Sequence, residues 1–267
     1  MNCFPRLAMR ALIFDLDDTL LVDEKVSLEV LGSIALSLGL YSHREQEDFV
    51  RDVRTIAKRR WEEGPCYSLC QSIGISSMEC LWGNFFGEKE WSSLRNWALE
   101  YRQEVFMEML HSLSIAKECV AFFEHERRAR QRLFPKAEIV LRELAQKYRL
   151  GLLTNGSPDL QREKLKASGL EPFFSSVIIS GEHGVGKPEP AIFEKILKEL
   201  GATASEAMMI GNSLERDIAG AHAAAIRSVW IDLGVEKERV SIPFDFKITD
   251  VSLLLTIVGE EKVILPA

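Results

Sequence analysis

The chain has 267 residues, a formal net charge of −7 and 46% hydrophobic residues. This length suits one large domain or two modest ones, and the composition excludes a collagen-like, a largely disordered or a disulfide-dense protein. The 40 acidic and 33 basic residues argue against a nucleic-acid binder, because such a protein needs clustered Lys and Arg to neutralise phosphates.

The sequence predicts a cytoplasmic protein with no membrane partner. No segment reaches the roughly 18 consecutive apolar residues that a spanning helix needs. Acidic residues follow the short apolar run near the N-terminus, where a signal peptide would have its cleavage region. The five cysteines are irregularly spaced and form no zinc-binding set with histidine, so we expect reduced, structural thiols.

The first predicted elements are a strand and a long helical stretch. Residues 10–15 form a short apolar run that ends in acids, which is typical of a buried strand. From 21 to 133 helical spacing dominates and no convincing strand occurs. Four of the five tryptophans fall within this stretch, which favours a small core of its own: Trp61, Trp82, Trp91 and Trp97.

After Pro135 strands and helices alternate. The predicted strands span 150–153, 177–180, 207–210, 227–232 and 246–248, and the predicted helices span 136–148, 158–168, 189–200, 214–224 and 251–258. Strands separated by helices imply a parallel sheet with helices on both faces. We therefore predict an α/β fold, with a discontinuous Rossmann-like core from 1–20 and 134–267 and an all-helical cap domain from 21–133.

Polar side chains follow each of the first four predicted strands. They are Asp15 and Asp17 after the first, Thr154 and Asn155 after the second, Lys187 in a Gly-rich loop after the third, and Asn212 and Asp217 after the fourth. In a parallel sheet, the carboxyl ends of the strands gather at one edge. Carboxylates hold Mg²⁺, while amides, a hydroxyl and an ammonium hold phosphoryl oxygens. The pattern predicts a site for a hard cation and a phosphate.

The segments that carry these side chains are FDLDDTL, LLTNG, GVGKPEPAIF and IGNSLERD. In all four, and in their order, the chain resembles the haloacid dehalogenase-like hydrolase superfamily, whose members are mostly Mg²⁺-dependent phosphatases. The helical stretch lies where many members carry an all-helical cap. The resemblance implies a phosphomonoester hydrolase that uses Mg²⁺ and acts on a small phosphorylated metabolite, with a sugar phosphate or a nucleoside monophosphate as the substrate. The protein would be a monomer or a homodimer.

The resemblance also implies that Asp15, Asp17 and Lys187 are catalytic and that Thr154, Asn155 and Lys187 bind phosphate. Asp15 would attack phosphorus and form an aspartyl-phosphate. Asp17 would protonate the leaving oxygen and later activate water, and residues i and i+2 of an extended segment point the same way. Thr154 and the amide of Asn155 would bind oxygens of the transferring phosphate. Lys187 would neutralise phosphoryl charge and keep Asp15 ionised.

The implied metal ligands are drawn from Asp15, Asp17, Asn212 and Asp217. Asp17 would contribute its backbone carbonyl. The fourth motif of the superfamily usually opens Gly-Asp, whereas this chain has Gly211-Asn212. Asn still offers an oxygen to Mg²⁺ but carries no charge. The residues leave open which of Asn212 and Asp217 contacts the metal directly. By resemblance Asn212 occupies the direct-ligand position, and Asp217 would act through water or through Lys187.

Two alternatives to a phosphatase stay open at this point. A phosphomutase of the sugar-phosphate type would use the same Asp15 and Asp17 but would keep water from the aspartyl-phosphate. A partner-binding protein with weakened catalysis is the non-enzymatic alternative, and its support is Asn212. A dehalogenase is disfavoured, because it needs neither an acid at position 17 nor a metal.

Overall fold

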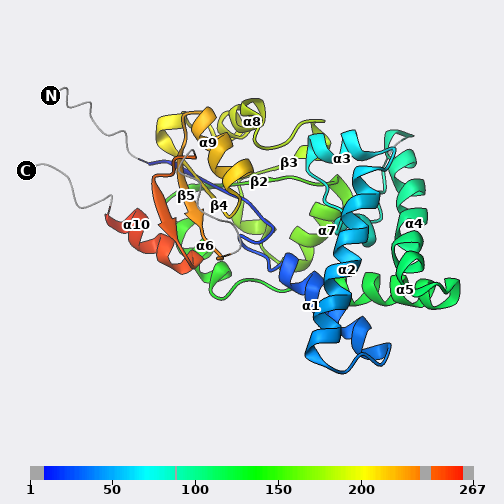
Figure 1. Ribbon diagram of the computed structural model, residues 1–267. Coiled ribbons are helices and arrows are strands. Elements are labelled where there is room, and N and C mark those ends of the chain that lie inside the picture. Colours follow the sequence, from blue (N-terminus) through cyan, green and yellow to red (C-terminus); the bar gives the residue numbers. More distant parts are fainter. Residues whose placement is uncertain (1–8, 88, 235–241, 261–267) are drawn as a thin grey trace, which may run out of the picture. The chain divides into compact units, whose positions relative to one another are not determined.

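The computed structural model describes residues 9–87, 89–234 and 242–260. Its strands form a six-stranded, fully parallel sheet in the order β3-β2-β1-β4-β5-β6 (Figure 1). The strands are β1 (Ala11–Phe14), β2 (Arg149–Thr154), β3 (Ser176–Ile179), β4 (Ala207–Gly211), β5 (Arg227–Ile231) and β6 (Phe246–Ile248). The predicted α/β fold with a parallel sheet is confirmed, and each predicted strand is present.

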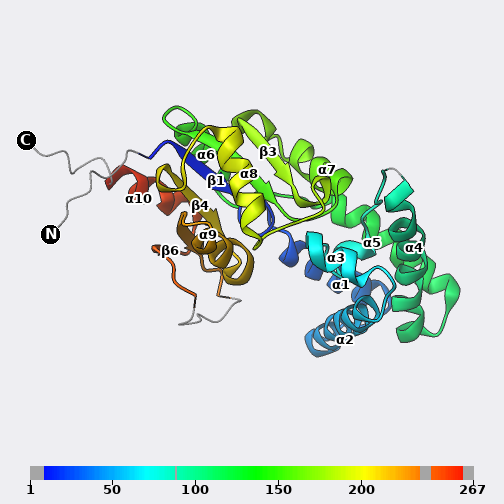
Figure 2. The same ribbon diagram turned by 90° about the horizontal axis from the view of Figure 1, so that it is seen from above.

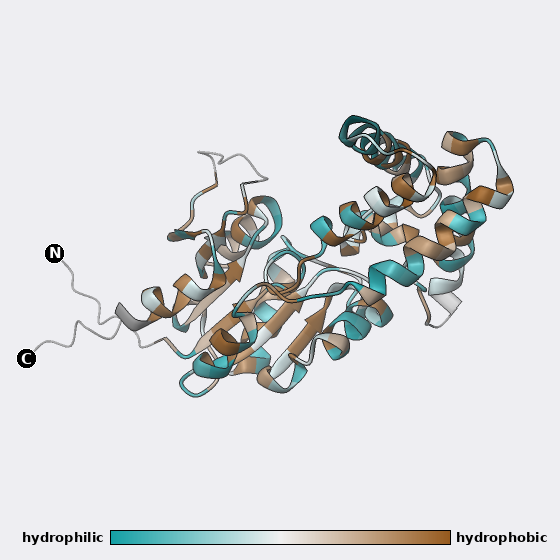
Figure 3. Ribbon diagram, turned by 90° about the horizontal axis from the view of Figure 1, so that it is seen from below, coloured by the Kyte–Doolittle hydropathy of each residue, from teal (hydrophilic) through white to brown (hydrophobic). Residues whose placement is uncertain are grey.

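The strands are buried along nearly their whole length. All four residues of β1 and all five of β4 are buried, and the strands are coloured mainly as hydrophobic in Figure 3. A parallel sheet is covered on both faces, so its strands carry continuous apolar runs in place of alternation. Helix α8 (Pro190–Leu200) and helix α9 (Ala219–Ala223) pack on one face, where a core cluster includes Ile13, Leu153, Ile178, Phe193, Ile196, Met209 and Ala221.

Three predicted helices differ from the observed ones. The predicted 136–148 helix is α6 (Ala137–Leu144), which ends earlier. The predicted 214–224 helix is a π-helical turn, Leu214–Ile218, followed by α9. The predicted 251–258 helix is a 3₁₀ turn, Val251–Leu253, followed by α10 (Leu254–Glu260). In contrast, α7 (Pro158–Ser168) has the predicted bounds, and α8 ends at Gly201 in the left-handed conformation that favours glycine.

The stretch from 21 to 133 is helical, as predicted, and no strand occurs among its described residues. Its helices are α1 (Glu24–Ser37), α2 (His43–Glu62), α3 (Tyr67–Ile73), α4 (Lys89–Leu110) and α5 (Leu113–Ala129). Helix α1 packs against α2 and α5, and α4 packs against the same two helices. A capping box begins α2, with the Ser42 hydroxyl and the Glu45 carboxylate each bound to the other residue's backbone.

The tryptophans of this stretch pack inside it. Trp82 and Trp91 are buried, and Trp61 and Trp97 are half-buried. Trp61 meets Tyr67 edge-on, with the ring centroids 4.8 Å apart. These aromatics are part of the core of the helical stretch, as expected.

The described residues group into two compact units. The first comprises the described parts of Met1–Leu21, Arg132–Thr154 and Ser168–Ala267, and the second comprises Val22–Gln131 and Asn155–Ala167. We call the second the helical unit. Residues 155–167 lie within the predicted core range of 134–267, yet they group with the helices.

A buried ionic cluster explains this grouping. The Lys164 ammonium on α7 lies 3.1 Å from Asp23 Oδ1 and 3.1 Å from Glu79 Oε1. Arg127 on α5 also pairs with Asp23, and its guanidinium lies 4.5 Å from the centroid of the Trp82 ring. Only 1% of each cationic side chain is exposed. A buried charge needs compensation, and the acids that compensate Lys164 come from the helical stretch.

No described helix is both long enough and apolar enough to cross a membrane. The four cysteines within the described residues are free and buried, as expected of structural thiols. They are Cys66, Cys70, Cys80 and Cys119, and Cys3 lies outside the described residues.

Candidate active site

Three predicted site residues follow adjacent strands of the sheet. Strand β1 lies between β2 and β4, with Phe14 in register with Leu152 and Ile210. The Asp15 amide donates to the Ile210 carbonyl at 2.9 Å, which continues the β1–β4 ladder into the site. Asp15, Thr154 and the residue after β4 are therefore neighbours at the carboxyl edge.

Lys187 joins two buried carboxylates at this edge. Its ammonium lies 2.5 Å from Asp15 Oδ1 and 2.7 Å from Asp217 Oδ1. Side-chain exposure is 2% for Lys187, 9% for Asp15 and 2% for Asp217. The structure thus brings together three predicted site residues that are far apart in the sequence.

These charges shift the pKa values of the group. Burial raises the pKa of Asp15 from 3.8 to about 6, because it penalises the charged form; Lys187 acts in the opposite direction and Asp217 adds to the rise. Burial alone would lower the pKa of Lys187, but Asp15 and Asp217 outweigh it and the pKa is raised. The ammonium therefore stays charged, and the two acids exceed the one cation.

Asp217 is held in place by the turn that follows β4. It lies in the π-helical turn Leu214–Ile218, and its Oδ2 accepts from the Ser213 amide at 3.0 Å. π-Helical turns occur frequently at functional sites. A Cβ added at Gly211 would lie 2.3 Å from Asp217 Oδ2, so only glycine permits this approach. Since its carboxylate contacts Lys187 and a backbone amide, Asp217 is placed to orient Lys187.

The segment after β1 folds back tightly. Leu16 is fully buried between Asp15 and Asp17, and Asp17 is half-buried. Asp18 has a φ of 55°, and its amide donates to the Leu21 carbonyl at 2.7 Å. Asp residues tolerate this left-handed conformation better than most. This turn closes the segment that carries Asp17 directly after β1.

Asn212 is tied to the turn after β1 and to strand β5. Its side-chain Oδ1 accepts from the Thr19 hydroxyl at 3.3 Å, and its backbone carbonyl accepts from Trp230 Nε1 at 2.9 Å. Neither Thr19 nor Trp230 is among the predicted site residues. Thr19 stands within the first motif, which is a signal for it, whereas no sequence signal marks Trp230.

The oxygen atoms at this edge suit a hard divalent cation. Asp15, the Asp17 carbonyl and Asn212 offer only oxygen, which Mg²⁺ prefers, and the buried acids exceed the single ammonium. No group of three or more His, Cys, Asp and Glu side chains placed to hold a metal occurs among residues 9–87, 89–234 and 242–260. A site here would therefore depend on the carbonyl and the Asn212 amide as well as on carboxylates. The donor chemistry fits Mg²⁺ on these terms.

The residues after β2 form a tight loop. Thr154 is 1% exposed and Asn155 is 9% exposed. Gly156 has a φ of 141°, and a Cβ there would lie 2.8 Å from Gln161. The hydroxyl of Ser157 is fully buried, with no hydrogen-bond partner among the described residues. A buried hydroxyl without a partner is unfavourable, so this loop has a polar group that a ligand or a water would satisfy.

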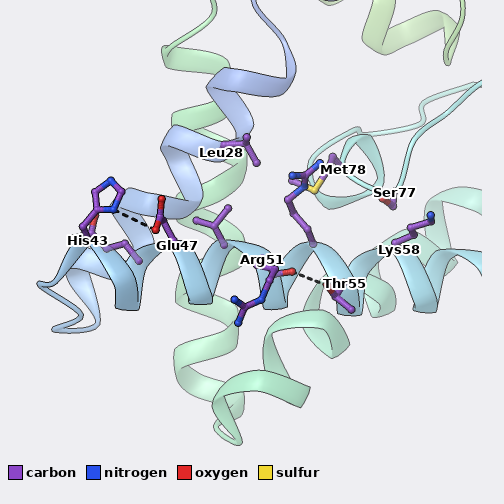
Figure 4. Close-up of a pocket in the computed structure, with 11 residues that line it drawn as sticks. Leu28, His43, Glu47, Arg51, Thr55, Lys58, Ser77 and Met78 are labelled. Carbon is purple, nitrogen blue, oxygen red and sulfur yellow. Dashed lines mark hydrogen bonds and ion pairs between the residues drawn. The ribbon is translucent and has the colours of Figure 1, made fainter. Parts of the chain in front are cut away.

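A separate hollow of about 650 Å³ lies in the helical unit between α1 and α2 (Figure 4). Its lining mixes basic and apolar side chains: Leu28, His43, Gln46, Glu47, Val50, Arg51, Arg54, Thr55, Lys58, Ser77 and Met78. Its basic groups are paired with acids, including Arg54 with Glu24 at 2.6 Å and His43 with Glu47 at 3.3 Å. None of the predicted site residues lines it.

Comparisons with known proteins agree with this fold. Residues 9–225 match the family model for the haloacid dehalogenase-like hydrolases. The chain is 39% identical over 248 residues to a phosphoserine phosphatase from Thermus thermophilus, covering 91% of this chain and 96% of that protein. It is 29% identical to an N-acylneuraminate-9-phosphatase from Mus musculus, and the match covers 84% of this chain and 83% of that protein. A haloacid dehalogenase-type hydrolase from Bacillus subtilis has a similar structure, with a TM-score of 0.64 at 21% identity over 95% of this chain and 100% of that one.

The chain therefore belongs to the haloacid dehalogenase-like hydrolase family. Within that family it is a phosphatase, because it resembles a protein of that activity over nearly the whole of both chains. It is an enzyme, and this replaces the partner-binding alternative.

Proposed function

We propose that the protein is a Mg²⁺-dependent phosphomonoester phosphatase that acts on a small phosphorylated metabolite through an aspartyl-phosphate on Asp15. The observation that carries the proposal is the buried Lys187 ammonium, 2.5 Å from Asp15 and 2.7 Å from Asp217 at the carboxyl edge of the sheet. A nucleophilic carboxylate must be ionised and must meet a dianionic substrate. A buried cation beside the carboxylate favours its ionised form and also favours its encounter with a dianionic substrate.

In the first half of the reaction, the Asp15 carboxylate attacks phosphorus and the bond from phosphorus to the leaving oxygen breaks. Asp17 donates a proton to that oxygen, so the alcohol leaves neutral. Thr154 and the Asn155 amide bind the phosphoryl oxygens, while Lys187 offsets their charge. Asp217 is a positioning residue, because it reaches the reaction only through Lys187.

In the second half, Asp17 accepts a proton from water, and the water oxygen attacks phosphorus. The bond between phosphorus and Asp15 breaks, which releases inorganic phosphate and restores both carboxyl groups. Asp15, the Asp17 carbonyl and Asn212 would hold Mg²⁺. When bound, the ion supplies positive charge that stabilises the transferring phosphoryl group.

Phosphoserine is the first substrate to test, because the relative that covers nearly the whole chain is named a phosphoserine phosphatase. Sugar phosphates and nucleoside monophosphates are the further candidates. The cytoplasm is the proposed location, supported by the free thiols of the four described cysteines.

The test measures phosphate release from p-nitrophenyl phosphate, phosphoserine, a hexose phosphate and a nucleoside monophosphate, with Mg²⁺ and with excess chelator. We expect Mg²⁺-dependent release and a loss of at least about 10³-fold in kcat for Asp15→Asn. Acid-quenched wild type should carry phosphate on the peptide that contains Asp15. Asp232→Asn is the matched control, since Asp232 follows β5 and pairs with Lys247 outside the site.

Two results would overturn the proposal. One is equal phosphate release by the wild type and Asp15→Asn. The other is conversion of a sugar 1-phosphate to its isomer with no free phosphate, which would identify a phosphomutase.

A further inference from the structure

The C-terminal end of α3 contacts the loop that follows the Thr154 strand. The Gly156 amide donates to the Ile73 carbonyl at 3.0 Å. The next residue, Gly74, ends α3 with a φ of 78°. A Cβ added at Gly74 would lie 2.6 Å from Asn155 Nδ2, 2.7 Å from its Cβ and 3.0 Å from its Cγ. All of these residues belong to the helical unit.

Helix termination alone does not account for the contact at Gly74. Gly169 has a similar φ of 71°, and a Cβ added there would meet nothing within 4 Å. Gly169 therefore needs glycine for its backbone conformation only. Gly74 needs glycine for the same conformation and also because the Asn155 side chain occupies the space where a Cβ would be.

We propose that Gly74 is a positioning residue of the active site, which fixes Asn155 by close packing and, with the Ile73 carbonyl, fixes the backbone of the loop. The inference rests on the proposed function, in which the Asn155 amide binds the transferring phosphate. The turn that would fix Asn155 in this way is distant from it in sequence.

The proposal predicts a specific defect for Gly74→Ala. The Asn155 Cβ is bonded directly to the backbone, so a clash at 2.7 Å cannot be relieved by rotating the end of a flexible side chain. The loop that carries the Asn155 amide must then shift. Because a misplacement of about 1 Å can cost about 100-fold in rate, we expect kcat/KM to fall about 10- to 100-fold. Inhibition by inorganic phosphate should weaken as well, since free phosphate uses the same amide.

The experiment compares the wild type, Gly74→Ala, Gly169→Ala, Asn155→Gly and the double variant Gly74→Ala/Asn155→Gly. Gly169→Ala is the matched control, because it introduces the same backbone strain in open space, and its kinetics should match the wild type. Asn155→Gly keeps the backbone amide and removes the clashing side chain. The clash that impairs Gly74→Ala is therefore absent from the double variant. Its kcat/KM and its inhibition by phosphate should come close to those of Asn155→Gly alone.

Outcomes for this inference and for the proposed function differ. If Asp15-dependent activity is present and Gly74→Ala behaves like Gly169→Ala, the positioning role is wrong and the function stands. Loss of activity in Gly74→Ala that removal of the Asn155 side chain does not relieve also contradicts it. If the wild type lacks Asp15-dependent activity, the proposed function fails. Hydrogen exchange at the Gly156 amide still tests the positioning, because Gly74→Ala should accelerate it and Gly169→Ala should not.

Discussion

Replacing Lys187 with methionine removes the one cation that we find between Asp15 and Asp217, and it keeps a side chain of similar length. Breaking a buried ion pair by removing one partner costs about 3–5 kcal/mol, because a charge is left uncompensated. The structure supports the same range by a second route. A hydrogen bond of 2.5 Å to Asp15 and an ion pair of 2.7 Å with Asp217 are lost, and a hydrogen bond to a charged group contributes about 1.5–3 kcal/mol.

The loss of stability in Lys187→Met should depend on pH. Lys187 lowers the pKa of Asp15, which burial and Asp217 raise to about 6 from 3.8. Without the ammonium, the folded-state pKa of Asp15 rises further. A carboxyl group whose folded pKa exceeds its unfolded pKa destabilises the protein as pH rises through that interval. The difference in the free energy of unfolding between Lys187→Met and the wild type should therefore be largest at pH 7 and shrink as the pH falls toward 4.

Urea unfolding in excess chelator, followed by circular dichroism at pH 7 and pH 5, measures both effects. With a slope of about 2–3 kcal/mol/M, the midpoint at pH 7 should fall by about 1–2.5 M. Lys195→Met is the matched control. The Lys195 side chain is 41% exposed and its ammonium lies 3.9 Å from Glu199, so its effect should be below about 1 kcal/mol. Equal midpoints for the two variants, or a difference that does not change with pH, would refute the reasoning.

Three further predictions concern packing and charge. Gly211→Ala places a Cβ 2.3 Å from Asp217 Oδ2 and should destabilise the protein by about 1–3 kcal/mol with a fall in kcat, measured by thermal unfolding and steady-state kinetics; unchanged kinetics would contradict the role of Asp217. Gly32→Ala lies within α1, where a Cβ meets nothing within 4 Å, and should stabilise by about 0.5–1 kcal/mol; a lower melting temperature would count against this. Lys164→Met removes the buried cation paired with Glu79, while Asp23 keeps its pair with Arg127, and should cost about 3–5 kcal/mol. Its unfolding midpoint and the fluorescence of the adjacent Trp82 should both change. A loss of stability below about 1 kcal/mol, as for an exposed ion pair, would argue against a buried cluster.

Much of the fold was predictable because its signals are local. The runs in β1 and β4 are continuously apolar, as strands buried on both faces must be, and Gly201 marks the end of α8 through its left-handed conformation. The prediction that the polar residues gather at one edge of the sheet followed from the parallel direction of the strands. The prediction failed for the 214–224 helix, which begins as a π-helical turn. The Ser213 amide donates to Asp217 there, and the spacing of hydrophobic residues gives no sign of such a contact.

The sequence by itself determined the class of fold, the helical character of 21–133 and the chemical types available at the carboxyl edge. These depend on hydrophobic spacing, turn residues and the position of polar groups after strands, which a chain carries locally. Tertiary structure alone decided that Lys187 pairs with both Asp15 and Asp217, that Thr19 binds Asn212, and that residues 155–167 join the helical unit. Those outcomes depend on burial and on contacts between distant segments, and the energy of a charge or a close contact is set only when its neighbours are in place.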